Sequence, residues 1–133
     1  MLYEDLTSKI IQACFEVSQE LGAGFLESVY EKALLVALVQ KGLKAESQIP
    51  LKVKFRNIVV GEFFADVLVG NVVLVELKAV SSLMKEHHAQ IINYLNATKI
   101  DVGLLINFGN PKLEYKRFHR KNKSKDILKT LTE

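Results

Sequence analysis

The 133-residue sequence contains one cysteine, two prolines and only seven glycines. The single cysteine, Cys14, excludes an internal disulfide framework and any metal site built from several thiolates. Little glycine and proline, with 49% hydrophobic and 25% charged residues, excludes collagen-like repeats and extended disorder. The chain is therefore expected to fold around a hydrophobic core without covalent cross-links.

Segments that would place the protein in a membrane or on a secretory route are also missing. No stretch approaches the roughly 18 apolar residues of a membrane-spanning helix. Residues 1–5 are acidic and lack the basic-then-apolar order of a signal peptide. No Gly-x-x-x-x-Gly-Lys motif occurs, which argues against a nucleoside triphosphatase. These absences predict a cytoplasmic protein without a membrane partner.

Hydrophobic periodicity predicts an alternation of helices and strands. The predicted helices cover residues 3–21, 26–40, 83–97 and 124–132, and the predicted strands cover 51–56, 63–69, 72–77, 102–108 and 113–119. Three of these strands are apolar on both faces, which is typical of strands covered on both sides. The helix at 83–97 makes a crossover, so the strands before and after it should be parallel. We predict one α/β domain over residues 1–133, with a mixed central sheet and helices on both faces.

The charges are unevenly distributed along the chain. Residues 112–133 carry eight basic and three acidic side chains, whereas residues 1–111 carry ten basic and twelve acidic ones. A basic strip suits a polyanion, because each neutralised phosphate releases condensed counterions. A solvated tail that only aids solubility would have the same composition. Pairing of the strand at 113–119 with its neighbour would bring four candidate nucleic-acid-binding residues beside the sheet: Lys116, Arg117, Arg120 and Lys121.

Three charged residues interrupt the apolar strands. Asp66 lies within 63–69, and Glu76 and Lys78 lie at the end of the next strand. Such residues are almost never buried without partners, since an unpaired buried charge costs several kcal/mol. A structural ion pair with Lys78 is one explanation, but it needs only one acid. Two carboxylates on adjacent strands are hard oxygen ligands that suit Mg²⁺, and we therefore favour a metal site.

The register of the two strands provides a check on this interpretation. A strict two-residue turn at Gly70-Asn71 would place Glu76 on the face opposite to Asp66. A three-residue connection that includes Val72, or a bulge, would place the two carboxylates across from each other. The metal site therefore requires an odd-numbered loop or a bulge.

Four short motifs occur in a fixed order along the chain. They are Gly24-x-x-Glu27-x-x-Tyr30, Asp66, Glu76-x-Lys78 and Gln90-x-x-x-Tyr94. This set resembles the small GxxExxY proteins of the PD-(D/E)XK nuclease-like superfamily, over about residues 5–119. The resemblance implies a restriction-endonuclease-like α-β-β-β-α-β core, which agrees with the predicted order of elements. The proline of the superfamily's name is absent, since Ala65 precedes Asp66.

The resemblance also implies a metal centre. Asp66 and Glu76 would hold Mg²⁺ or Mn²⁺ together with the carbonyl oxygen of Leu77. Lys78 would activate or orient the attacking water. Glu27, on an early helix, would be an additional acidic ligand or would hold a water on the metal.

Two residues of the helix at 83–97 complete the candidate catalytic set. Gln90 and Tyr94 resemble the helix motif of the RecB-like branch, which lies against the active site. Their spacing of four puts them on one stripe, at the edge of the apolar arc that should face the sheet. Tyr94 could also be a boundary aromatic whose hydroxyl reaches water.

Two functions of different classes follow from these residues. The first is a Mg²⁺- or Mn²⁺-dependent nuclease that hydrolyses phosphodiester bonds, with DNA as the favoured substrate and DNA repair as a plausible setting. The second is a non-catalytic nucleic-acid or protein-binding module on a nuclease fold. A homodimer would suit the nuclease, because cutting two strands needs two sites. Retained charges in buried strands favour the first function.

Overall fold

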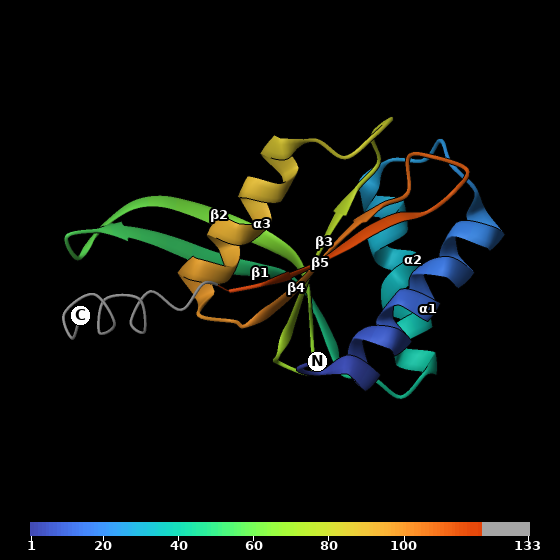
Figure 1. Cartoon of the computed structure of the whole chain (residues 1–133), viewed down its shortest axis with the longest axis horizontal. Coiled ribbons are helices and arrows are strands. Elements are labelled where there is room, and N and C mark those ends of the chain that lie inside the picture. The colour runs from blue at the N-terminus through green and yellow to red at the C-terminus, as the bar shows by residue number, and fades with distance from the viewer. Residues whose placement is uncertain (121–133) are drawn as a thin grey trace.

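The computed structural model describes residues 1–120, so the predicted helix at 124–132 lies outside the described residues. Eight elements follow one another along the described chain (Figure 1). They are α1 (Glu4–Leu21), α2 (Glu27–Gln40), β1 (Ala45–Phe55), β2 (Ile58–Val69), β3 (Val73–Lys78), α3 (Lys85–Thr98), β4 (Val102–Asn107) and β5 (Glu114–His119). This is the predicted α-β-β-β-α-β order, with an additional helix before it and an additional strand after it. None of the helices within residues 1–120 is long and apolar enough to cross a membrane.

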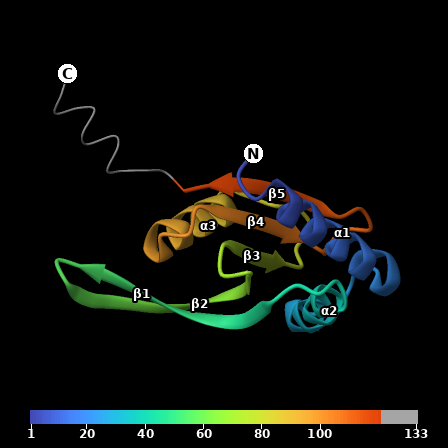
Figure 2. The ribbon, with the colours of Figure 1, turned by 90° about the horizontal axis from the view of Figure 1, so that it is seen from below.

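The five strands form one mixed sheet in the order β1-β2-β3-β4-β5 (Figure 2). Only β3 and β4 are parallel, and α3 connects them, as the crossover prediction required. The other neighbouring strands are antiparallel. The mixed sheet of the predicted α/β fold is therefore confirmed.

Helices cover both faces of the sheet, because β3 and β4 are apolar on both sides. Alternate residues of β3, such as Val75 and Leu77, pack with α1 and α2 in one cluster. The intervening Leu74 packs with Ile91 and Leu95 of α3 in a second cluster. The functional consequence is that Glu76 and Lys78, which alternate with Leu77, belong to the α3 face.

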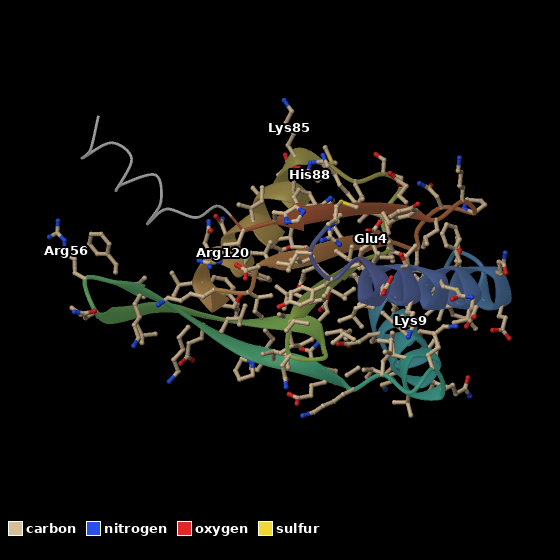
Figure 3. The ribbon with its side chains drawn as sticks, turned by 60° about the horizontal axis from the view of Figure 1, so that its bottom comes forward. Glu4, Lys9, Arg56, Lys85, His88 and Arg120 are labelled. Carbon is tan, nitrogen blue, oxygen red and sulfur yellow. The ribbon has the colours of Figure 1, made fainter. Side chains whose placement is uncertain are left out.

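The β1–β2 hairpin is longer than predicted. The sequence pattern indicated strands at 51–56 and 63–69, but β1 begins at Ala45 and β2 begins at Ile58. The turn residues Arg56 and Asn57 have φ values of 52° and 67°, as in the type I′ turn that joins tightly paired strands. Figure 3 shows Arg56 at the tip of the hairpin, far from α1. The prediction was wrong in length because the added residues are mostly exposed and lack apolar periodicity.

The β2–β3 connection has three residues. Val69 pairs with Val73, which leaves Gly70, Asn71 and Val72 in the loop. Gly70 and Asn71 adopt φ values of 59° and 61°, a left-handed conformation that these two residue types tolerate. The loop is therefore the odd-numbered one that places Asp66 across from Glu76.

Candidate functional site

The carboxylates of Asp66 and Glu76 lie between β2 and β3, where the backbone ladder stops. The last pair of the ladder is Val67 with Val75. Beyond it, the backbone N–H of Asp66 donates to Glu76 Oε1 at 2.9 Å, and the backbone N–H of Leu77 donates to Asp66 Oδ2 at 2.8 Å. Each carboxylate thus accepts a backbone N–H of the neighbouring strand, and the two side chains are held next to each other.

A distortion of β2 at Asp66 makes this arrangement possible. Ser47 pairs with Val67 and Ile49 pairs with Ala65, so Asp66 has no partner in β1 either. The residue of β1 that would face it, Gln48, has a φ of 53°. Ala65 and Val67, which a regular strand would place on one face, pack in opposite clusters. The backbone of Asp66 is therefore free to bond with the side chain of Glu76.

The carbonyl oxygen of Leu77 faces the same gap. The backbone N–H of Leu77 donates to Asp66 on β2. The carbonyl oxygen of the next residue, Lys78, accepts the N–H of Phe108 on the β4 side. Successive carbonyls of a strand point to opposite edges, so the Leu77 carbonyl is directed toward β2. Together with the two carboxylates, it makes three oxygen-bearing groups that could bind a metal at one edge of β3.

Burial sets the electrostatics of Glu76. Its side chain is 3% exposed, and this desolvation, assisted by the negative charge of Asp66, raises its pKa to about 8. The positive charge of Lys78 acts in the opposite direction and is too weak to restore the ordinary pKa. Without a cation, Glu76 therefore holds a proton near neutral pH.

Glu27 lies within the electrostatic reach of this pair. Partial desolvation raises its pKa; the charges of Lys78 and His87 lower it, and that of Asp66 raises it. Yet within residues 1–120 no three His, Cys, Asp or Glu side chains are close enough together to hold a metal. The structure thus places Glu27 beside the Asp66–Glu76 pair without clustering the three carboxylates.

Tyr30 fixes the segment that presents Glu27. The ring is fully buried and stacks on Phe108, with centroids 4.6 Å apart and planes 1° from parallel. Its hydroxyl donates to the carbonyl of Gly22 at 2.6 Å and accepts the N–H of Phe25 at 3.2 Å. The Gly24-x-x-Glu27-x-x-Tyr30 motif is therefore a turn, an acid at the first residue of α2, and the side chain that anchors the turn.

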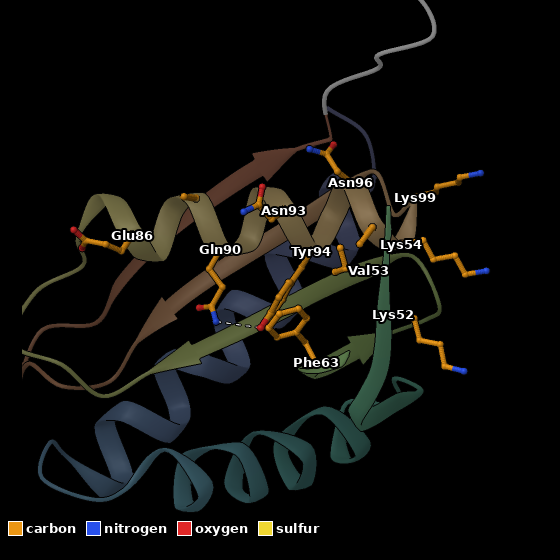
Figure 4. A pocket seen from close by; sticks show the side chains of 12 residues that line it. Lys52, Val53, Lys54, Phe63, Glu86, Gln90, Asn93, Tyr94, Asn96 and Lys99 are labelled. Atoms are coloured by element: carbon orange, nitrogen blue, oxygen red, sulfur yellow. Dashed lines mark hydrogen bonds between the residues drawn. The ribbon is translucent and has the colours of Figure 1, made fainter. Parts of the chain in front are cut away.

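Gln90 and Tyr94 of α3 are bonded to each other, and Tyr94 lies within the electrostatic reach of the carboxylates. Gln90 Nε2 donates to the Tyr94 hydroxyl at 3.1 Å (Figure 4). Burial raises the pKa of Tyr94, and the charges of Glu76 and Asp66 raise it further. Tyr94 is thus close enough to the pair to feel both charges, and its hydroxyl is bonded to Gln90.

Asn107 is a positioning residue that was not among the residues predicted from the sequence. It is fully buried and stands beside Lys78 in the β3–β4 register. Its side chain pairs with both backbone groups of Val80, through Oδ1 and Nδ2 at 2.9 Å each. A Cβ at Gly109 would lie 2.0 Å from the Val80 carbonyl oxygen, so the backbone segments at Gly109 and Val80 are too close for any residue other than glycine. The clamp holds the segment that follows Lys78. A polar residue ending an apolar strand was the only signal.

Three of the four predicted nucleic-acid-binding residues, Lys116, Arg117 and Arg120, lie on or beside β5, and β4 separates them from the carboxylates. Arg117 donates to Thr7 Oγ1 at 2.8 Å and to the carbonyl of Leu2, and Arg120 forms an ion pair with Asp101 at 3.0 Å. Lys116 lies 5.4 Å above the Phe118 ring. Lys121 lies outside the described residues. The two arginines thus already bond within the chain.

The donor set fits a hard divalent cation. Asp66, Glu76 and the Leu77 carbonyl supply only oxygen, and Mg²⁺ is typically held by one or two carboxylates together with water and substrate phosphate. A cation bound between the two carboxylates would offset their mutual repulsion and would favour the ionised form of Glu76. The site contains no thiolate within residues 1–120, since the one cysteine, Cys14, is buried in the α1–α2 cluster.

Two solved structures are similar to this chain. The crystal structure of SSO0001 is similar over 96% of this chain and 64% of its own, with a TM-score of 0.56 and 16% sequence identity. An alkaline exonuclease (LHK-Exo) from Laribacter hongkongensis is 12% identical, with a TM-score of 0.43, over 72% of this chain and 57% of its own. This chain therefore spans less than two thirds of the length of either protein, and the first likeness shows the fold alone.

Among curated proteins, none matches the sequence. The family model of the PD-(D/E)XK nuclease superfamily matches residues 4–118, which include all seven candidate catalytic and metal-binding residues from Glu27 to Tyr94 and most of β5. The protein therefore belongs to the PD-(D/E)XK nuclease superfamily.

Proposed function

We propose that this protein is a Mg²⁺- or Mn²⁺-dependent nuclease that hydrolyses phosphodiester bonds, with DNA as the favoured substrate. Within the superfamily, its motifs are those of the GxxExxY proteins, with an α3 motif of the RecB-like type. One observation carries the proposal: the carboxylates of Asp66 and Glu76 lie side by side between β2 and β3, and each accepts a backbone N–H of the other strand. Lys78 follows two residues after Glu76 on the same face of β3. Nucleases of this superfamily typically use divalent metals.

Asp66, Glu76 and the Leu77 carbonyl would hold the metal. When bound, it would act as a Lewis acid and neutralise charge on the phosphate and the leaving oxygen. This role accounts for two acids in strands that are otherwise apolar.

The residues of the chain then position water and stabilise charge. In hydrolysis, the water oxygen bonds to phosphorus, one P–O ester bond breaks, and the leaving oxygen receives a proton. Lys78 lies on the α3 face with Glu76, where its ammonium group can orient the water and stabilise the negative charge that develops on the phosphate. Glu27 can accept a hydrogen bond from that water, and Tyr94 can donate one to a phosphate oxygen.

The alternative is a binding module that has lost catalysis. Such a module would be more stable with a neutral residue in place of Glu76. A buried carboxyl group with a pKa of about 8 destabilises the metal-free fold when it ionises. The intact Asp66–Glu76–Lys78 set therefore favours the enzyme.

Cleavage of labelled substrates tests the proposal. Single-stranded and duplex DNA and RNA would be incubated with Mg²⁺, Mn²⁺ or EDTA, and with wild type, Asp66→Asn or Lys78→Ala. We expect cleavage by wild type that requires metal and is lost in both variants. Equal cleavage by Asp66→Asn and wild type would show that the activity lies elsewhere. Size-exclusion chromatography would decide between a monomer and the proposed homodimer.

A further inference from the structure

An open groove of about 1100 Å³ runs between the β1–β2 hairpin and α3. One wall comes from β1 and the other from α3, with Phe63 of β2 between them (Figure 4). Gln90 and Tyr94 line it as well. Tyr94 lies within the electrostatic reach of Asp66 and Glu76, so this lining residue brings the groove close to the candidate active site.

Positive charge gathers at one end of this groove. Lys52 and Lys54 of β1 and Lys99, which follows α3, lie at the rim of that end and direct their side chains outward from it, whereas the one acidic lining residue, Glu86, lies at the other end (Figure 4). Within residues 1–120, none of these three lysines takes part in an ion pair. They differ in this respect from Arg120 and are free to contact a polyanion.

An aromatic surface lies between the lysines and the candidate site. Phe63 is 44% exposed, and its ring lies against Tyr94 with centroids 5.9 Å apart and planes tilted by 42°. An exposed ring beside positive charge is the arrangement on which unpaired bases stack while lysines contact the backbone. In a duplex, the base faces are covered by neighbouring bases, so they cannot reach such a ring.

We propose that this groove binds a single-stranded segment of nucleic acid, with its phosphates at Lys52, Lys54 and Lys99 and one base stacked on Phe63. The proposal rests on the proposed nuclease function and adds a substrate class to it. It assigns binding of the scissile strand to the groove between the hairpin and α3. The β5 arginines, already bonded within the chain, have no part in this subsite.

Fluorescence anisotropy with a labelled oligonucleotide tests the proposal in the absence of divalent metal, so that no cleavage occurs. The variant Lys52→Ala/Lys54→Ala/Lys99→Ala should bind the single strand more weakly. Its slope of log K against log salt should be smaller by about 2, from roughly 0.7 per lost phosphate contact. The matched control is Lys9→Ala/Lys32→Ala/Lys44→Ala, which removes the same charge at exposed positions outside the groove lining. Figure 3 shows one of these, Lys9, on α1 away from the hairpin.

Substitutions of Phe63 separate stacking from charge. Phe63→Ala should weaken single-strand binding roughly 5- to 100-fold, whereas Phe63→Tyr should bind like wild type. Circular dichroism of each variant would confirm the fold. A duplex of the same sequence should bind more weakly than the single strand and should not respond to Phe63→Ala.

The outcomes distinguish the groove from the nuclease activity. If wild type cleaves nucleic acid but the groove and control triple variants bind equally well, the groove proposal is wrong and the nuclease stands. If wild type never cleaves but only the groove variants lose single-strand binding, the groove stands and the nuclease is wrong. Duplex binding as tight as single-strand binding would also overturn the groove proposal.

Discussion

Replacing Glu76 by Gln should stabilise the metal-free protein at neutral and alkaline pH. The pKa of Glu76 is about 8 in the folded protein, against an ordinary value of 4.5. The folded state therefore binds this proton more tightly than the unfolded state does. The associated stability is present below pH 4.5 and is lost as the pH rises through 8.

The size of the effect follows from that shift. Each pKa unit corresponds to about 1.4 kcal/mol, so a rise from 4.5 to about 8 represents about 3 to 5 kcal/mol of unfolding free energy between pH 5 and 9. For a chain of this size, that is on the order of 10 °C in Tm. Glu76 is almost completely buried, so solvent screens this effect little.

Thermal unfolding from pH 5 to 9 in EDTA would measure it. The Tm of wild type should fall with pH relative to that of Glu76→Gln, while the exposed control Glu20→Gln should follow wild type. Added Mn²⁺ should raise the Tm of wild type more at pH 8 than at pH 6, since at pH 6 the metal must displace the proton that Glu76 carries. Parallel pH curves for wild type and Glu76→Gln would refute the argument, because they would show that Glu76 titrates normally.

Three further variants test other parts of the site. Lys78→Ala should slow cleavage at least about 100-fold in single-turnover kinetics and leave Mn²⁺ affinity, measured by calorimetry, within about threefold of wild type. Unchanged kinetics would show that Lys78 has no part in the mechanism. Tyr30→Phe keeps the stack on Phe108 but loses two hydrogen bonds. Urea unfolding should therefore show a free energy of unfolding lower by about 1 kcal/mol, and amide exchange should be faster around Gly24. Exchange as slow as in wild type would contradict the anchoring role. Asn107→Leu leaves both backbone groups of Val80 without their partner and should lower the free energy of unfolding by about 2 to 5 kcal/mol in the same urea assay. A loss under about 1 kcal/mol would show that water replaces the Asn107 side chain.

Hydrophobic periodicity predicted the helices and the central strands because their burial is decided locally. Val75 and Leu77 are buried on one face and Leu74 on the other, and this leaves a clear pattern in the sequence. The outer halves of β1 and β2 are exposed, so their strand structure depends on pairing with each other and on the Arg56-Asn57 turn. Pairing of exposed strands leaves no repeating pattern of apolar residues in the sequence from which the strands could be predicted.

The candidate site could be located from the sequence because charges in apolar strands are rare. The distortion at Asp66 could not, since it depends on the conformation of Gln48 in the adjacent strand. The clamp at Asn107 depends on contact with Val80, 27 residues away, which no local pattern encodes. The groove beside Phe63 arises only when the hairpin and α3 are placed together.

The central claim is that Asp66 and Glu76 jointly bind the divalent metal. Isothermal titration of Mn²⁺ at pH 8 into wild type, Asp66→Asn, Glu76→Gln and the control Glu20→Gln measures this directly. We expect saturable binding to wild type and to Glu20→Gln, and affinity at least about tenfold weaker in each of the two site variants. Wild-type affinity in either Asp66→Asn or Glu76→Gln would contradict the claim.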